Sequence, residues 1–186
     1  MIRSIFCLMA TVLGITFSFS TQVQAADLTR NFGIGLQGAT PAYGLVQEQS
    51  EPILGGISFR YNGLAPIYFQ TVGHFVLNDQ DNDHILGASL SYAIFEHESQ
   101  WNIARLYFEL EGGGRYQKRQ ELSQEILKTT TLGAGLAFGG ELVFSLGGIP
   151  LGLNVKVGQG VGRETTDSQS KGRAGVYVGT GIHAYF

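Results

Sequence analysis

Apolar residues recur at every second position in eight separate stretches of the chain. In the first stretch Phe32, Ile34 and Leu36 alternate with small or polar residues, which is the two-residue period of a strand with unlike faces. The pattern therefore predicts an all-β protein of eight strands, each with one apolar face. The predicted strands cover residues 32–37, 57–61, 67–77, 86–94, 105–111, 132–144, 151–158 and 176–186.

The connections between these stretches alternate between short and long. Short links fall at 62–66, 96–102 and 147–150, and longer polar links fall at 41–53, 78–83, 120–130 and 164–173. Short periplasmic turns and longer outer loops are typical of outer-membrane barrels. Because hydrocarbon offers no water to backbone amides, a spanning sheet must close on itself. We therefore predict a transmembrane, antiparallel, up-and-down barrel of eight strands, with ten strands as the second choice because ten would shorten the loops.

The first 25 residues have the features of a cleaved export signal. Arg3 is followed by an apolar stretch over 5–19 and by the small-x-small site at Val23-Gln24-Ala25. This stretch is shorter than a membrane-spanning helix needs. We expect cleavage after Ala25, a barrel domain over 26–186, and a location in the outer membrane of a Gram-negative bacterium. The chain's one cysteine, Cys7, lies in the signal, so disulfides and thiolate metal sites are not expected.

Charge and glycine content refine this interpretation. The chain of 186 residues is 15% charged with a net charge of −3, which gives no reason to expect nucleic acid as a partner. Many of the 27 glycines fall on the faces opposite the large apolar residues. A narrow barrel needs little side-chain volume on its inner face, so these faces are expected to line the lumen.

The predicted lumen carries ionisable groups that must pair, since enclosed charges are costly without partners. We expect Glu141 to pair with Lys156 across neighbouring strands, with Arg105 or Arg60 serving the remaining carboxylates. An ionic plug that fills the interior is favoured over a gated polar pathway or a proton site. The predicted cluster comprises Arg60, Arg105, Glu109, Glu111, Glu141 and Lys156, with Gln70, His74 and His183 on the same faces.

Aromatic residues near the short turns predict a girdle at one membrane interface. The terminal Phe186 ends an alternating strand in the way expected of the signal that the barrel-insertion machinery recognises. The predicted interface residues are Tyr61, Phe69, Phe95, Trp101, Phe144 and Phe186.

Catalytic candidates are few. His97-Glu98-Ser99 in a short turn, or His74 with Ser58 or Ser89, offers the base and hydroxyl that lipid A acylases or deacylases use. The four histidines are scattered, so no metal cluster is expected, and we expect no catalytic residue and no cofactor.

Two outer links have distinctive sequences. Asp79, Asp81 and Asp83 have the spacing that opens a calcium loop, but the glycine and glutamate that such a loop needs are absent. We interpret this link as a solvated hairpin that loosely attracts divalent cations of lipopolysaccharide. The apolar spacing in 120–128 predicts a short helical turn in an outer loop.

Short motifs give the chain a family resemblance. The order Gly33-Ile34-Gly35, Pro41-Ala42-Tyr43-Gly44, Pro52-Ile53, Phe59-Arg60-Tyr61, Gly73 to Asp79 and Leu90-Ser91-Tyr92 resembles the opening half of MltA-interacting protein/OmpV-like barrels. Thr166-Asp167-Ser168 and the ending from Gly179 to Phe186 are similar to their last hairpin. The chain is much shorter than those barrels. The resemblance implies a scaffold for a periplasmic peptidoglycan-remodelling protein, and it identifies no binding residue.

These observations together predict a monomeric, non-enzymatic barrel with a structural, scaffolding or interaction role at the envelope. Its expected surroundings are outer-membrane lipid and lipopolysaccharide. A small-solute pore and a lipid A-modifying enzyme remain as alternatives.

Overall fold

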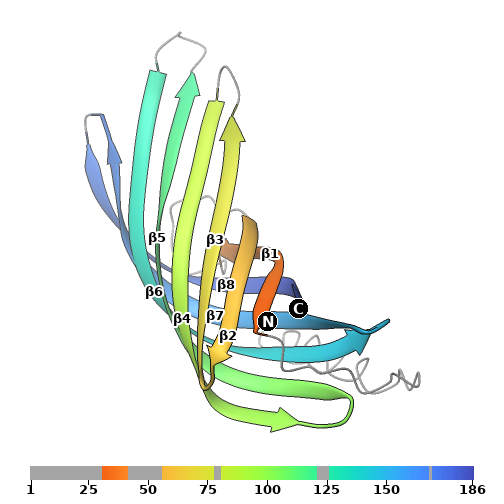
Figure 1. Ribbon diagram of the computed structural model, residues 1–186. Coiled ribbons are helices and arrows are strands. Elements are labelled where there is room, and N and C mark those ends of the chain that lie inside the picture. The colour runs from red at the N-terminus through yellow and green to blue at the C-terminus, as the bar shows by residue number, and fades with distance from the viewer. Residues whose placement is uncertain (1–30, 42–55, 78–80, 121–125, 168) are drawn as a thin grey trace, which may run out of the picture.

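The chain forms one closed barrel of eight antiparallel strands, each paired with its neighbours in sequence (Figure 1). The computed structural model describes residues 31–41, 56–77, 81–120, 126–167 and 169–186, so the predicted signal lies outside the described residues. Within these residues no helix has the length and hydrophobicity needed to cross a membrane. The strands are β1 (Phe32–Pro41), β2 (Gly56–Leu64), β3 (Ile67–Leu77), β4 (Asp81–Glu98), β5 (Asn102–Gln120), β6 (Ile126–Leu146), β7 (Ile149–Thr166) and β8 (Ser170–Tyr185).

The first and last strands close the ring. β1 pairs with β8 from Gly33 opposite Tyr185 onward, and the amides of Phe32 and Phe186 each donate to the other's carbonyl, at 3.3 and 2.9 Å. The turns at 65–66, 99–101 and 147–148 lie at this same end. We call it the short-turn end and the opposite one the outer end. Gly147 and Gly148 both have positive φ (60° and 86°), as a two-residue hairpin turn requires.

Strands β4 to β7 are longer than predicted. They run for 18 to 21 residues, whereas a spanning strand needs about 9 to 11. The predicted links at 78–83, 120–130 and 164–173 are therefore partly strand, and the expected helical turn is wrong for residues 126–128, which belong to β6. Beyond the stretches of apolar alternation, pairing with two neighbouring strands still satisfies the backbone. This explains strand extensions that hydrophobic periodicity does not reveal.

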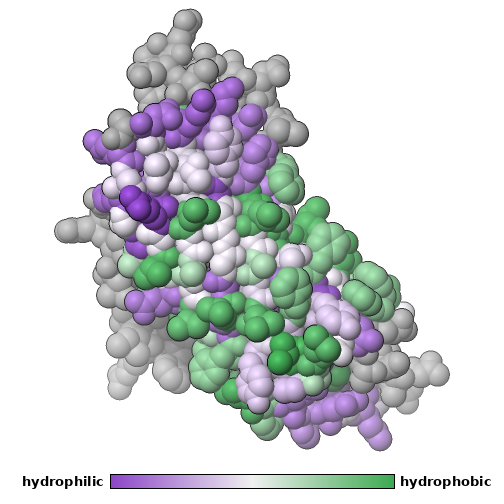
Figure 2. All heavy atoms as spheres, turned by 60° about the vertical axis from the view of Figure 1, so that its left-hand side comes forward, coloured by the Kyte–Doolittle hydropathy of each residue, from purple (hydrophilic) through white to green (hydrophobic). Residues whose placement is uncertain are grey.

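Burial alternates along each strand with the apolar residues outside. Leu136 is 67% exposed and Leu132 is 63% exposed, whereas Glu109, on a lumen-facing position of β5, is 2% exposed. Figure 2 shows hydrophobic side chains gathered over the middle and lower part of one face, with hydrophilic ones above them. This distribution reverses that of a water-soluble protein and places the polar core inside the ring.

Large lumen side chains lie over glycines of the adjacent strands. Lys156 stands opposite Gly139 of β6 and Gly179 of β8, and a Cβ at either position would come within 2.9 Å of the lysine chain. Tyr107 of β5 covers Gly139 from the other side, at 2.8 Å. The glycine-rich faces therefore provide the space in which long polar side chains cross the barrel.

Candidate functional site: a polar plug beneath an outer cavity

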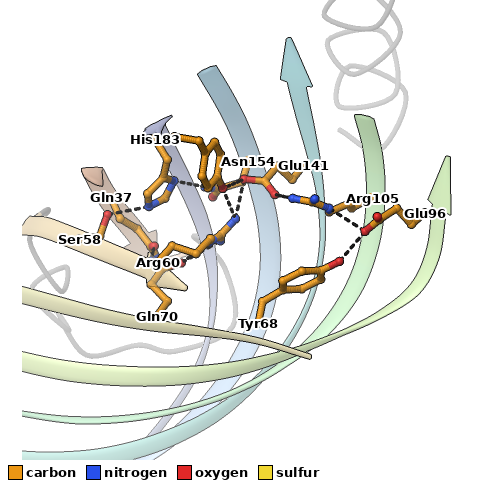
Figure 3. A network of polar contacts seen from close by, with 11 residues as sticks. Gln37, Ser58, Arg60, Tyr68, Gln70, Glu96, Arg105, Glu141, Asn154 and His183 are labelled. Carbon is orange, nitrogen blue, oxygen red and sulfur yellow. Dashed lines mark hydrogen bonds and ion pairs between the residues drawn. The ribbon is translucent and has the colours of Figure 1, made fainter. Parts of the chain in front are cut away.

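A carboxylate at the centre of the lumen holds two arginines (Figure 3). Glu141 of β6 accepts from Arg60 Nη1 of β2 at 2.5 Å and from Arg105 Nη1 of β5 at 3.2 Å. The Tyr185 hydroxyl donates to the same carboxylate at 2.5 Å. Each of these side chains is buried. The contacts join β2, β5, β6 and β8, so the network ties opposite walls of the barrel together.

The two arginines extend the network in opposite directions. Arg60 donates to Gln70 Oε1 from Nε and Nη2, at 3.1 and 2.8 Å, and Gln70 in turn donates to Gln37. Arg105 Nε donates to Glu96 at 2.7 Å, and its guanidinium lies 4.9 Å from the centre of the Tyr68 ring. Tyr68 also donates to Glu96. Both guanidinium groups are buried away from water, and these hydrogen bonds give them acceptors within the lumen.

A second ionic group lies toward the outer end. Lys156 Nζ of β7 donates to Glu109 at 2.9 Å and to Glu111 at 2.7 Å, both from β5. Lys156 and Glu109 are 3% and 2% exposed, so their attraction is little screened by water. We call this group, together with the Glu141 network, the lumen plug.

His183 completes the lower part of the lumen. Its Nε2 lies 2.7 Å from the Ser58 hydroxyl, and its Nδ1 lies 3.3 Å from the Asn154 side chain. Ser58 and His183 are both register partners of Gly35 on β1, so the two side chains meet above a residue that has none. Both are 0% exposed, so the pair is enclosed within the lumen.

The predicted Glu141–Lys156 pair is wrong. Glu141 stands opposite Asn154 in the register, and Lys156 stands opposite Gly139. The lysine instead reaches over β6 to the two glutamates of β5, and both arginines converge on Glu141. All six residues of the predicted cluster nevertheless face the lumen, where each forms an ion pair.

A cavity of about 470 Å³ lies between the plug and the outer end. Its floor is formed by Glu109, Glu111 and Lys156, and its walls contain many glycines of β5 to β8. Below the plug, Ile103 and Val143 form an apolar layer near the short turns, and this layer packs against the ring of Tyr185, whose hydroxyl belongs to the plug. The lumen therefore contains a cavity toward the outer end and is filled by side chains toward the short-turn end. We call this filled part the packed base.

The catalytic candidates do not assemble. His74 faces the lumen opposite Ile85, while Ser58 is bound to His183. His97 and Glu98 belong to β4, and the Ser99 hydroxyl accepts from the amides of Trp101 and Asn102. No group of three potential metal ligands occurs among the described residues.

Ion pairs also face inward near the outer end. Arg115 donates to Asp83 through Nε at 2.9 Å and Nη2 at 2.6 Å, and these hydrogen bonds hold the pKa of Asp83 below its usual range. Arg173 pairs with Glu164 at 2.6 Å. Of the predicted cation-attracting aspartates, Asp79 lies outside the described residues, and Asp83 is bound to an arginine.

The predicted interface aromatics lie at the short-turn end. Phe69, Phe95, Trp101 and Phe186 are exposed, and Tyr61 and Phe144 are partly exposed. Phe32, which the sequence reasoning did not include, contacts Tyr61 with ring centres 5.1 Å apart.

A second aromatic row at the outer end was not predicted. The His84 ring lies between Phe75 and Tyr116, with centroid distances of 5.8 and 6.2 Å. These residues are register partners on β3, β4 and β5, so they form one line across three strands. Only the strand register reveals the row, because its members lie far apart in sequence.

Comparisons with known proteins add one structural likeness. No protein-family model and no curated protein matches the chain, so the resemblance to MltA-interacting protein/OmpV-like barrels rests on the short motifs. The chain is similar to the solved structure of Neisserial surface protein A (NspA), with 14% sequence identity and a TM-score of 0.41. The likeness covers 84% of this chain and 95% of that one.

Proposed function

We propose that the chain is a non-enzymatic outer-membrane β-barrel of a Gram-negative envelope, with a structural or interaction role. The observation that carries this proposal is the reversed polarity of the ring, whose large apolar residues point outward while its ion pairs fill the lumen. Soluble monomers rarely expose a contiguous apolar patch beyond a few hundred Å². A closed ring leaves no unpaired strand edge for hydrocarbon to meet, which supports a spanning role.

The packed base favours a structural role over a pore. Arg60, Arg105 and Glu141 occupy the lumen and bind one another, and each is at most 7% exposed. Eight strands enclose little more than side-chain room. An interaction role would use the outer end or the short turns, and the MltA-interacting protein/OmpV-like resemblance favours a periplasmic peptidoglycan-remodelling protein as partner. Insertion through recognition of Phe186 belongs to the same proposal.

We expect the full-length protein to fractionate with the outer membrane and to require detergent for extraction. A closed sheet resists dodecyl sulfate until heated, so the unheated and boiled samples should migrate differently on a gel. A mature chain that remains compact and soluble in buffer without detergent would contradict the proposal.

We expect the reconstituted barrel to give no stable conductance steps in a planar bilayer. The plug and the apolar layer of Ile103 and Val143 block the lumen at two levels. Discrete single-channel openings from the wild-type protein would instead identify a solute pore.

The lipid A-modifying alternative has its own test. The Ser58–His183 pair has the atoms of a nucleophile and a base, but it is enclosed, and His74 and His97 have no serine partner among the described contacts. Mass profiles of lipid A should be identical with and without expression of the chain. A change that reverts with His74→Ala or His97→Ala would establish an enzyme.

A further inference from the structure

Basic side chains face outward on the described strands at the outer end of the barrel. On the described strands there, the outward-facing charged side chains are Lys118 of β5, Lys128 of β6 and Arg163 of β7. The acidic residues Asp83 and Glu164 occupy lumen-facing positions and bind arginines. The described strands therefore carry three basic side chains on their outward face above the apolar belt, and Asp167 of the β7–β8 turn is an exposed acid at the same end.

These basic residues begin where the apolar belt ends. On β6 the outward-facing apolar residues run from Leu146 to Leu132, and on β7 they run from Ile149 to Val161. Beyond the girdle residue Phe144, the stretch of β6 from Leu142 to Leu132 rises roughly 25 Å in a strand tilted by about 40°, which is the height of the apolar band of an outer-membrane barrel. Lys128 and Arg163 are outward-facing positions beyond those limits, so they lie at the level of lipid headgroups.

The aromatic row marks the same boundary on the preceding strands. Tyr116 is the outward-facing residue next to Lys118, and it stacks on His84. Aromatic rings of this kind settle at the interface between hydrocarbon and headgroups. The aromatic row therefore places the basic residues at the level of the headgroups, without reference to the number of belt residues on β6 and β7.

Lys118 and Lys128 stand directly opposite each other in the β5–β6 register. Like charges at such a position destabilise a strand pair unless an anion lies between them. Neither lysine has a hydrogen bond or ion pair among the described residues. Asp83 and Glu164 face the other side of the sheet and bind arginines, and the exposed Asp167 of the β7–β8 turn forms no ion pair with either lysine within the described part of the chain. The pair thus presents two ammonium groups to a ligand on the lipid side.

We infer that Lys118 and Lys128 form a binding site for the phosphate groups of lipid A in the outer leaflet, with Arg163, which is hydrogen-bonded to Ser170, on the same face nearer the apolar belt. A phosphate of lipid A lies at the edge of the hydrocarbon and carries the charge that would bridge the lysine pair. Lysine binds phosphate as a compact charge, and its long chain can reach along the interface. The inference rests on the proposed membrane location, because only an embedded barrel brings lipid headgroups to this height.

The test measures lipid A retention by the full chain purified in a neutral detergent. Lipid A bound after gel filtration is quantified by mass spectrometry for the wild type and for Lys118→Gln/Lys128→Gln. Surface electrostatics predicts roughly a fivefold loss of affinity per lysine, or about 25-fold for the pair. Lys118→Arg/Lys128→Arg should retain binding, and Lys171→Gln, which removes an inward-facing charge from the outer end, should change it little.

Three results would overturn the inference. The first is that the double glutamine variant retains as much lipid A as the wild type. The second is that the wild type retains dephosphorylated lipid A as well as it retains intact lipid A. The third is that inorganic phosphate, at the same concentration as the lipid, displaces lipid A. Heat-dependent gel mobility is recorded for every variant. A wild type that lacks this mobility shift refutes the proposed barrel, whereas a shifted, membrane-inserted protein without lysine-dependent binding refutes only the lipid A site.

Discussion

Glu141→Gln should destabilise the barrel by about 3–5 kcal/mol, the cost of leaving buried charge without its partner. Glu141 is the acceptor on which Arg60 and Arg105 converge, and it also accepts from Tyr185. Arg105 keeps its second carboxylate, Glu96, but Arg60 keeps only the neutral Gln70 and Tyr185. Unfolding in urea from lipid vesicles, followed by the heat-dependent gel shift and by Trp101 fluorescence, measures the loss.

Glu164→Gln is the matched control for this substitution. It removes the same charge from the Arg173 pair, whose side chains are 22% and 33% exposed. Such a pair is worth at most about 1 kcal/mol. Equal losses for the two variants would show that Glu141 does not hold the lumen together.

The double variant Arg60→Met/Glu141→Met separates lost charge balance from lost packing. Replacing both members of a buried pair with apolar residues of similar volume is often neutral or stabilising. We therefore expect the double variant to be more stable than Glu141→Gln, because no unpartnered guanidinium remains. If the double variant loses as much stability as the two single substitutions lose together, the loss comes from packing and not from an unpartnered charge.

The strand count and the lumen faces follow from the sequence because both depend on local periodicity. Arg60, Glu109 and Lys156 each alternate with apolar neighbours, so the face of each is settled by the two residues beside it. The extent of β5 and β6 beyond the belt does not follow, since the stretch around Gly113 has no apolar alternation. There the closed sheet, rather than lipid, keeps the chain extended.

The partner of each lumen charge could not be predicted from adjacent strands. Lys156 passes its register partner Gly139 and binds Glu109 and Glu111 on the strand beyond, and His183 meets Ser58 above Gly35 in the same way. A glycine opposite a long polar residue is the sequence signal for such contacts. This signal can be used only once the strand register is known, because a register shift of one residue moves every side chain to the other face.

Gly35→Ala should prevent closure of the barrel. A Cβ at Gly35 would lie 1.9 Å from the Ile182 carbonyl oxygen and 2.8 Å from His183 Cα, both of them backbone atoms of β8. Because overpacking a well-filled site costs about 1–3 kcal/mol and here a strand must move, we expect a loss at or above the top of that range. The methyl group would also enter the space in which Ser58 meets His183.

A glycine series makes this expectation specific to the β1–β8 seam. Gly160→Ala places a Cβ in the lumen at 3.6 Å from the Ala134 carbonyl oxygen, an ordinary contact, and Gly172→Ala meets nothing within 4 Å. Both controls should refold into vesicles with the wild-type yield and show the gel shift, while Gly35→Ala should lose most of the shifted form. The strand that closes the ring is also one of the shortest, so few other contacts can compensate for a displaced β1. If Gly35→Ala refolds as well as Gly160→Ala, then β1 does not approach β8 this closely, and the Ser58–His183 contact above it loses its basis.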